Sequence, residues 1–184
     1  MKKDVLLPLA SVHESARKIL KGDFSYEIHY DYDTEMGLFC HDFEAMRDDL
    51  SIEIISKKIH FIFPDEIPDL LLNGDKKRLS QVMYNLVSNS IKYSREEGII
   101  SIYFKKTGNY LKVYIKDTGI GISTADIPYI FNKFYRAEKC RNQNIPGSGL
   151  GLSISKYIVE AHGGFINCVE SSLNGTIICF GLPI

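Results

Sequence analysis

Glycine is crowded into one stretch of this 184-residue chain, and this crowding constrains the fold and chemistry more than any other feature. Half of the 14 glycines lie between positions 119 and 164, namely Gly119, Gly121, Gly147, Gly149, Gly151, Gly163 and Gly164. Because glycine has no Cβ atom, its backbone adopts turns that other residues avoid and lies close against a ligand. We therefore expect loops in this stretch that contact a bound molecule.

The hydrophobic periodicity predicts alternating strands and helices after about residue 56. Runs with alternating apolar residues, bounded by turn residues, indicate strands, and apolar spacings of three and four indicate helices. The expected strands cover residues 58–63, 99–106, 111–116, 165–170 and 176–182, and the expected helices cover 75–94 and 152–161. Asn174-Gly175 predicts a hairpin turn between the last two strands, and Gly163 predicts the end of the second helix.

The first predicted helix carries two neighbouring stripes. The apolar stripe, which is expected to be buried, consists of Leu79, Val82, Met83, Leu86 and Ser90. Asn85, Asn89 and Lys92 follow on the polar side at spacings of four and three. A carboxamide oxygen is a ligand suited to Mg²⁺, and a lysine ammonium group complements a phosphate. Taken alone, this stripe is better explained as a solvated polar face.

Asp117 ends an alternating strand and begins the motif Asp-x-Gly-x-Gly. A carboxylate at this point can accept a hydrogen bond from an exocyclic amine, and Gly119 and Gly121 let a flat base approach the backbone. Adenine offers such an amine at its pairing edge, whereas guanine offers a carbonyl there. An Asx-type turn is the alternative explanation for this motif when it is considered alone.

Gly147, Gly149 and Gly151 precede the second helix, where backbone N–H groups and the helix N-terminus favour an anion. The spacing is neither that of a dinucleotide-binding loop nor that of a Gly-x-x-x-x-Gly-Lys phosphate loop. The preceding loop is basic, with Lys133, Arg136, Lys139 and Arg141. It is typical of a lid over a triphosphate, with one arginine stabilising the transferred phosphoryl group, although a solvated charged loop is the alternative.

Five ordered motifs resemble the nucleotide-binding boxes of the GHKL superfamily, which includes gyrase-type ATPases, a mismatch-repair ATPase and histidine kinases. They are residues 81–94 (N box), 117–122 (first glycine box), 130–136 (F box), 147–164 (second glycine box) and 175–176 (last box). The F box resembles that of sensor histidine kinases. The resemblance implies an α+β fold, in which a mixed sheet and helices form a two-layer α/β sandwich that binds ATP.

This resemblance also implies individual roles. Asn89 would coordinate Mg²⁺ near Asn85, Asp117 would read the adenine amine together with Thr176, and Arg136 would act at the phosphates. The implied catalytic residues are Asn85, Lys92 and Arg136. The implied ATP-binding residues are Asn85, Asn89, Lys92, Tyr93, Asp117, Gly119, Gly121, Ile122, Phe134, Gly147, Ser148, Gly149, Leu150, Gly151 and Thr176.

One departure from the ATPases concerns the reaction. Those enzymes place a water-activating Glu where this chain has Asn85, so transfer of the γ-phosphoryl group to a protein histidine is favoured over hydrolysis. The expected cofactors are ATP and Mg²⁺. Two alternatives remain open, namely an inactive ATP-binding or dimerisation module that modulates an intact kinase, and a GHKL ATPase.

Residues 1–50 resemble a HAMP signalling segment, with heptad-spaced apolar residues in two stretches joined by an extended connector. The expected domains are therefore a HAMP-like helical hairpin at 1–50 and an ATP-binding catalytic domain at 51–184. Pairing of two such hairpins would allow the chain to form a homodimer. The dimerisation segment that carries the acceptor histidine in such kinases has no counterpart here, and none of the five histidines is identified as a phosphoacceptor. The acceptor is therefore expected in trans, with a response regulator downstream.

Composition is typical of a protein in a reducing, intracellular compartment. The net charge of -1 offers no field for nucleic acid, and the four cysteines form no Cys-x-x-Cys pair. No apolar run reaches the length of a membrane span, so this chain is expected to be cytoplasmic. The expectation that the parent kinase is anchored in a membrane rests only on the resemblance of residues 1–50 to a HAMP segment.

Overall fold

The computed structural model describes residues 52–63, 74–137 and 147–184. The HAMP-like segment and most of the basic loop lie outside these residues. In the described part, strands β1 (His60–Ile62), β2 (Ile99–Thr107), β3 (Tyr110–Asp117), β4 (Phe165–Ser172) and β5 (Gly175–Pro183) form a sheet in the order β1-β2-β3-β5-β4. Strand β1 runs parallel to β2, and the other neighbours are antiparallel, so the sheet is mixed as expected.

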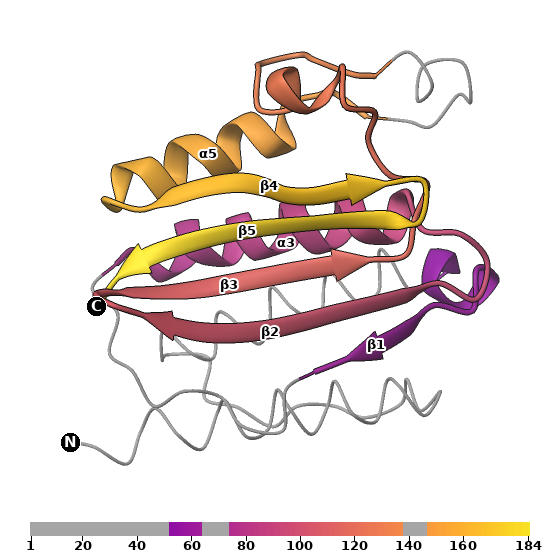
Figure 1. Ribbon diagram of the computed structural model, residues 1–184, viewed down its shortest axis with the longest axis horizontal. Coiled ribbons are helices and arrows are strands. Elements are labelled where there is room, and N and C mark those ends of the chain that lie inside the picture. Colours follow the sequence, from indigo (N-terminus) through magenta and orange to yellow (C-terminus); the bar gives the residue numbers. More distant parts are fainter. Residues whose placement is uncertain (1–51, 64–73, 138–146) are drawn as a thin grey trace. The chain divides into compact units, whose positions relative to one another are not determined.

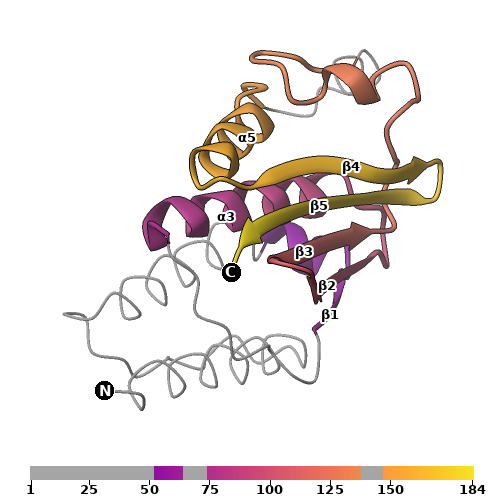
Figure 2. The ribbon, with the colours of Figure 1, turned by 60° about the vertical axis from the view of Figure 1, so that its left-hand side comes forward.

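Two helices cover one face of this sheet, as Figures 1 and 2 show from two directions. They are α3 (Lys76–Lys92) and α5 (Gly151–Ala161), and a single 3-10 turn, η1 (Ile127–Tyr129), lies between β3 and α5 in the sequence. Residues 52–56 are also helical. The two-layer α/β sandwich is therefore confirmed, and the helices and strands begin and end within about two residues of the predicted positions. None of the helices in the described part is both long and apolar enough to span a bilayer.

The core lies between the helices and the sheet. The inward-facing side chains of β3, Leu111, Val113 and Ile115, are each at most 6% exposed, as the alternation predicts. The buried residues of α3 are Val82, Leu86, Val87, Ser90 and Ile91. Leu79 and Met83 are only half-buried, so the predicted apolar stripe was placed too far toward the start of the helix.

Strand β4 continues two residues beyond its predicted end. Its register against β5 shifts between Cys168 and Glu170, which is the signature of a β-bulge. A bulge breaks the alternation of side chains, so a period-two pattern stops where the bulge begins. Because the strand continues to Ser172, Ser171 pairs with Thr176 and reaches the end of the sheet at which Asp117 lies.

His162 ties the two helices together at the end of α5. Its Nδ1 lies 2.7 Å from the Ile158 carbonyl oxygen, and its Nε2 accepts the Asp75 backbone N–H at 2.9 Å. Since Asp75 donates to Nε2, the proton of the neutral imidazole is on Nδ1, where it can be donated to Ile158. Asp75 is also the N-cap of α3 and accepts the Arg78 N–H at 3.1 Å.

His162→Ala is expected to lower the free energy of unfolding by about 1–2 kcal/mol, because it leaves two hydrogen-bonding groups without their partner. Urea unfolding measures this loss. The matched control is His60→Ala, at an exposed position in β1, where we expect a change within about 0.5 kcal/mol. Equal losses in the two variants would show that the tie between the helices contributes nothing.

Candidate functional site

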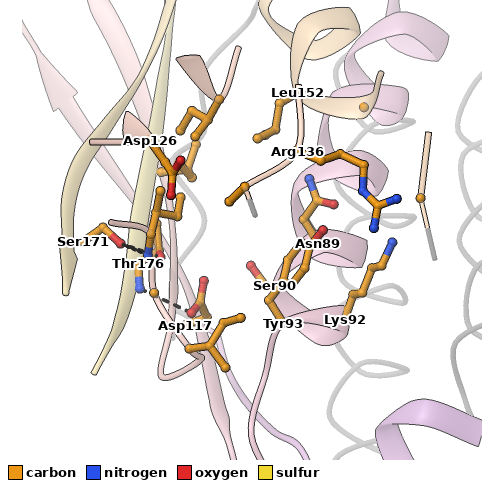
Figure 3. A pocket seen from close by; sticks show the side chains of 18 of the residues that line it. Asn89, Ser90, Lys92, Tyr93, Asp117, Asp126, Arg136, Leu152, Ser171 and Thr176 are labelled. Atoms are coloured by element: carbon orange, nitrogen blue, oxygen red, sulfur yellow. Dashed lines mark hydrogen bonds between the residues drawn. The ribbon is translucent and has the colours of Figure 1, made fainter. Parts of the chain in front are cut away.

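A cavity of about 640 Å³ opens between α3, the loop after β3, the β4–β5 hairpin and the start of α5. Figure 3 shows Asp117, Ser171 and Thr176 on the sheet side and Asn89, Lys92 and Arg136 on the other side. The predicted site residues that line the cavity are Asn85, Asn89, Lys92, Tyr93, Asp117, Gly121, Ile122, Arg136, Gly147, Ser148, Gly149, Gly151 and Thr176. The fold therefore brings together residues that span 92 positions of sequence.

Asp117 is buried at the sheet end of the cavity, with 9% of its surface exposed. Its Oδ1 accepts the backbone N–H of Gly119 at 2.8 Å and that of Thr176 at 3.3 Å. Both donors converge on one oxygen, so the second carboxylate oxygen accepts neither of them. Burial raises the pKa of Asp117 above its ordinary value, and the two backbone N–H groups and the Ser90 hydroxyl lower that pKa in part. A buried acceptor of this kind suits a ligand that brings its own hydrogen-bond donor.

The β4–β5 hairpin supports Asp117 from the other side. Thr176 pairs with Asp117 across β3 and β5, and its Oγ1 lies 2.9 Å from the Ser171 Oγ. Ser171 also accepts the backbone N–H of Ile122 at 2.8 Å. Sequence reasoning missed Ser171 and Ser90. Ser90 was placed on the buried stripe, whereas Ser171 depends on a strand register that no local motif reveals.

Two glycines of the loop before α5, Gly147 and Gly149, each meet a different part of the site. A Cβ on Gly147 would lie 2.6 Å from the Lys92 Nζ, so a glycine leaves room for that ammonium group. Gly149 has a φ of +72° and its carbonyl accepts the Phe134 N–H at 3.0 Å. The loop therefore lies against α3 at one end and against the F box in its middle.

Asn85 closes the loop at Gly151. Its Nδ2 donates to the Gly151 carbonyl at 3.1 Å and to the Ser155 Oγ at 3.3 Å. A carbonyl oxygen only accepts, so the amide nitrogen of Asn85 must be the atom that faces α5. Ser155 is fully buried and its hydroxyl lies 2.9 Å from the same Gly151 oxygen. Asn85 thus fixes the first turn of α5 against α3.

Three of the predicted ATP-binding residues, Gly119, Phe134 and Leu150, do not line the cavity. A Cβ on Gly119 would lie 2.4 Å from the Tyr93 carbonyl oxygen, so this glycine allows the Asp117 loop to approach α3. Phe134 is 68% exposed and has a φ of +63°, and its backbone N–H donates to the Gly149 carbonyl of the glycine loop. Leu150 is the N-cap residue of α5.

Asp126 and Tyr135 also line the cavity and were not predicted. The Tyr135 hydroxyl donates to Asp126 Oδ1 at 2.6 Å, and the Ser123 hydroxyl donates to Oδ2 at 2.7 Å. These two hydrogen bonds hold the pKa of Asp126 below its ordinary value, and the bond from Tyr135 has the larger effect. These contacts fold the F box back onto the loop that follows Ile122.

The sequence profile of histidine kinase-, DNA gyrase B- and HSP90-like ATPases matches residues 74–184. The chain belongs to this ATPase family. The sensor histidine kinase WalK of Bacillus subtilis strain 168 is 39% identical over 133 residues, which are 70% of this chain and 22% of that protein. The WalK kinase of Staphylococcus haemolyticus strain JCSC1435 is 42% identical over 127 residues, which are 66% of this chain and 21% of that protein.

Solved structures of this ATPase family agree with the sequence relatives. The catalytic domain of histidine kinase ThkA has a TM-score of 0.62 and 30% identity, covering 76% of this chain and 89% of that structure. The mycobacterial sensor histidine kinase MprB has a TM-score of 0.63 and 26% identity, covering 77% of this chain and 95% of that structure. The described domain is thus an ATP-binding domain of the histidine-kinase type. The chain spans about a fifth of the length of the curated relatives it matches.

Proposed function

We propose that this chain is the catalytic part of a two-component sensor histidine kinase and transfers the γ-phosphoryl group of ATP to a histidine on a separate segment. The observation that carries the proposal is the distribution of charge in the cavity, which is acidic at one end and basic at the other. A buried carboxylate lies at the sheet end, whereas Lys92, Arg136 and the glycine loop lie at the other end. This arrangement suits a ligand with an amine-bearing base at one end and phosphates at the other.

At the base end, we propose that Asp117 accepts the adenine amine and that Thr176 supports it directly or through water. Gly121 and Ile122 line the cavity next to this carboxylate, and Gly119 holds its loop against α3. At the phosphate end, Lys92, Tyr93, Arg136 and the loop from Gly147 to Gly151 would contact the phosphates. Phe134 would act through its backbone bond to Gly149, rather than by contact with ATP.

Magnesium fits the donor set at the phosphate end. The described residues contain no group of three or more acidic, histidine or cysteine side chains that could hold a metal by themselves. Asn89 offers a carboxamide oxygen from α3, which is a hard ligand of the kind Mg²⁺ accepts alongside phosphate oxygens and water. Bound Mg²⁺ would neutralise charge on the phosphates, and Asn89 would be its ligand from this chain.

Transfer to a protein acceptor is favoured over hydrolysis by the state of Asn85. Its amide is neutral, and its nitrogen donates to Gly151 and Ser155, so it offers no base that could activate water. Positioning and charge neutralisation are then the main contributions of the protein. In the reaction, a nitrogen of the acceptor imidazole bonds to the γ-phosphorus, the bond to the bridging oxygen of ADP breaks, and the imidazole proton is released.

The acceptor histidine is proposed to lie on a dimerisation segment supplied in trans. Of the described histidines, His162 uses both ring nitrogens in the tie between the helices and His60 lies in β1. A response regulator would receive the phosphoryl group downstream. Dimerisation through the HAMP-like residues 1–50, the division of the chain near residue 50 and membrane anchoring of the parent kinase belong to the same proposal.

The proposal is tested by incubating the chain with Mg²⁺ and γ-labelled ATP, alone and with a purified dimerisation segment bearing an acceptor histidine from a related sensor kinase. We expect acid-labile phosphate on the added segment and none on the chain alone. ATP binding without any label would identify a nucleotide-binding module that modulates another kinase. Steady release of inorganic phosphate without label would identify an ATPase.

A further inference from the structure

The C-terminal end of α3 lies beside the cavity, and its last carbonyl oxygens lack partners within the helix. The Tyr93 N–H donates to the Asn89 carbonyl at 3.0 Å, and the Ser94 N–H donates to the Ile91 carbonyl at 3.1 Å. These bonds leave the Lys92 carbonyl oxygen, and the second lone pair of the Ile91 carbonyl oxygen, to accept hydrogen bonds from outside the helix. The partner comes from a residue that precedes these two carbonyl groups by more than thirty positions in the sequence.

That partner is Lys57, which follows the helical residues 52–56. Its Nζ donates to the Ile91 carbonyl at 3.0 Å and to the Lys92 carbonyl at 2.8 Å. A third contact joins the same ammonium group to Glu53 Oε1 at 2.8 Å. A cation is favourable at a helix C-terminus, both by hydrogen bonding and by its charge against the helix dipole. Three directed bonds also fix the orientation of a side chain that would otherwise be free to move.

The end of α3 is held from the pocket side as well. The Tyr93 carbonyl accepts the Ile120 N–H at 3.0 Å, which joins the helix end to the Asp117 loop. Lys92, Tyr93 and Ile120 all line the cavity, whereas Lys57 does not. The ammonium group of Lys57 therefore contacts the backbone of two residues, one of which carries a side chain of the phosphate end.

We propose that Lys57 is a positioning residue of the nucleotide site, which sets the place of Lys92 by holding the carbonyl groups at the end of α3. The inference rests on the proposed function, because it assigns phosphate binding to Lys92. Through Glu53, the same ammonium group connects residues 52–56 to the site. A displacement of these residues would thus change how Lys92 meets the phosphates, without any change in the residues that touch ATP.

The test compares Lys57→Met, Lys57→Gln and Lys57→Arg with the matched control Glu53→Gln in the full chain. Calorimetric titration measures the affinity for Mg-ATP and for adenosine. We expect Lys57→Met and Lys57→Gln to weaken ATP binding about 5- to 10-fold, with adenosine affinity changed less than twofold, because adenosine has no phosphates for Lys92. Lys57→Arg should restore most of the ATP affinity, and Glu53→Gln should keep it, because the carbonyl contacts remain.

Hydrogen exchange of the Tyr93 and Ile120 amides gives a readout that does not require ATP. Lys57→Met should accelerate their exchange about tenfold relative to the Val113 amide of β3, and Lys57→Arg should not. Failure of the wild-type chain to bind ATP would refute the proposed function, and the exchange data would still decide the role of Lys57. Unchanged exchange at both amides overturns the inference. Equal losses of ATP and adenosine affinity also overturn it, since they would reflect a general loss of stability.

Discussion

Asp117→Asn is expected to weaken ATP binding about 100-fold, while the nucleotide-free chain unfolds with the same or a higher free energy. The loss of affinity follows from chemistry at the base end. Asparagine keeps an oxygen for the N–H groups of Gly119 and Thr176, but it can present an amide N–H where the carboxylate would accept the adenine amine. Replacing the hydrogen bond between the adenine amine and a charged carboxylate by two N–H groups that face each other weakens binding by about 2–3 kcal/mol.

The effect on stability follows from the raised pKa of Asp117. A group whose pKa is raised on folding stabilises the fold at low pH, and this contribution is lost as the pH rises through the folded-state pKa. The ordinary value is 3.8, and burial places the folded value above it. At pH 7, the wild-type chain therefore holds a desolvated charge that the neutral asparagine removes. The stability difference between the two chains should shrink as the pH falls through the pKa of Asp117 toward 3.8.

Calorimetric titration with Mg-ATP and urea unfolding at pH 7 and pH 4 measure the two effects. Circular dichroism of the folded variant is the control for intact secondary structure. A variant that binds ATP as well as the wild type would contradict the base-reading role. A variant that is markedly less stable at pH 7, but not at pH 4, would contradict the direction of the pKa shift.

The sequence predicted the fold well because each element has a strong local pattern. Strand β3 alternates apolar and polar residues over its whole length, and α3 begins at a side-chain cap on Asp75. The prediction failed where tertiary structure overrides the pattern. The bulge near Cys168 hid the last residues of β4, and packing against the sheet buries Val87 and Ile91 of α3, which the predicted stripe did not include.

The sequence predicted those residues of the candidate site that belong to a recognisable motif and act through their own side chains or through the absence of one. Asp117 and the glycines were found in this way, because their residue types and spacings are unusual. Ser171 and Lys57 were not found, because their partners are backbone groups at distant positions. A backbone carbonyl belongs to every residue and leaves no mark in a sequence, so contacts of this kind require coordinates.

Gly121→Ala is expected to lower the free energy of unfolding by at least about 2 kcal/mol and to weaken ATP binding at least tenfold. Gly121 has a φ of +70°, which disfavours any residue with a Cβ. A Cβ there would lie 1.7 Å from the Ser172 carbonyl oxygen, so the β4–β5 hairpin must move. Because Ser171 and Thr176 belong to that hairpin and Gly121 lines the cavity, the displacement reaches the base end directly.

The matched control separates backbone strain from the clash. Gly108 has a similar φ of +57°, but nothing lies within 4 Å of a Cβ built on it, and it does not line the cavity. Gly108→Ala should therefore lose only about 1 kcal/mol of stability and should bind ATP within twofold of the wild type. Urea unfolding and titration with Mg-ATP measure both variants. If the two alanines had equal effects, positive φ alone would explain Gly121, and the close approach of the hairpin would have no role in forming the site.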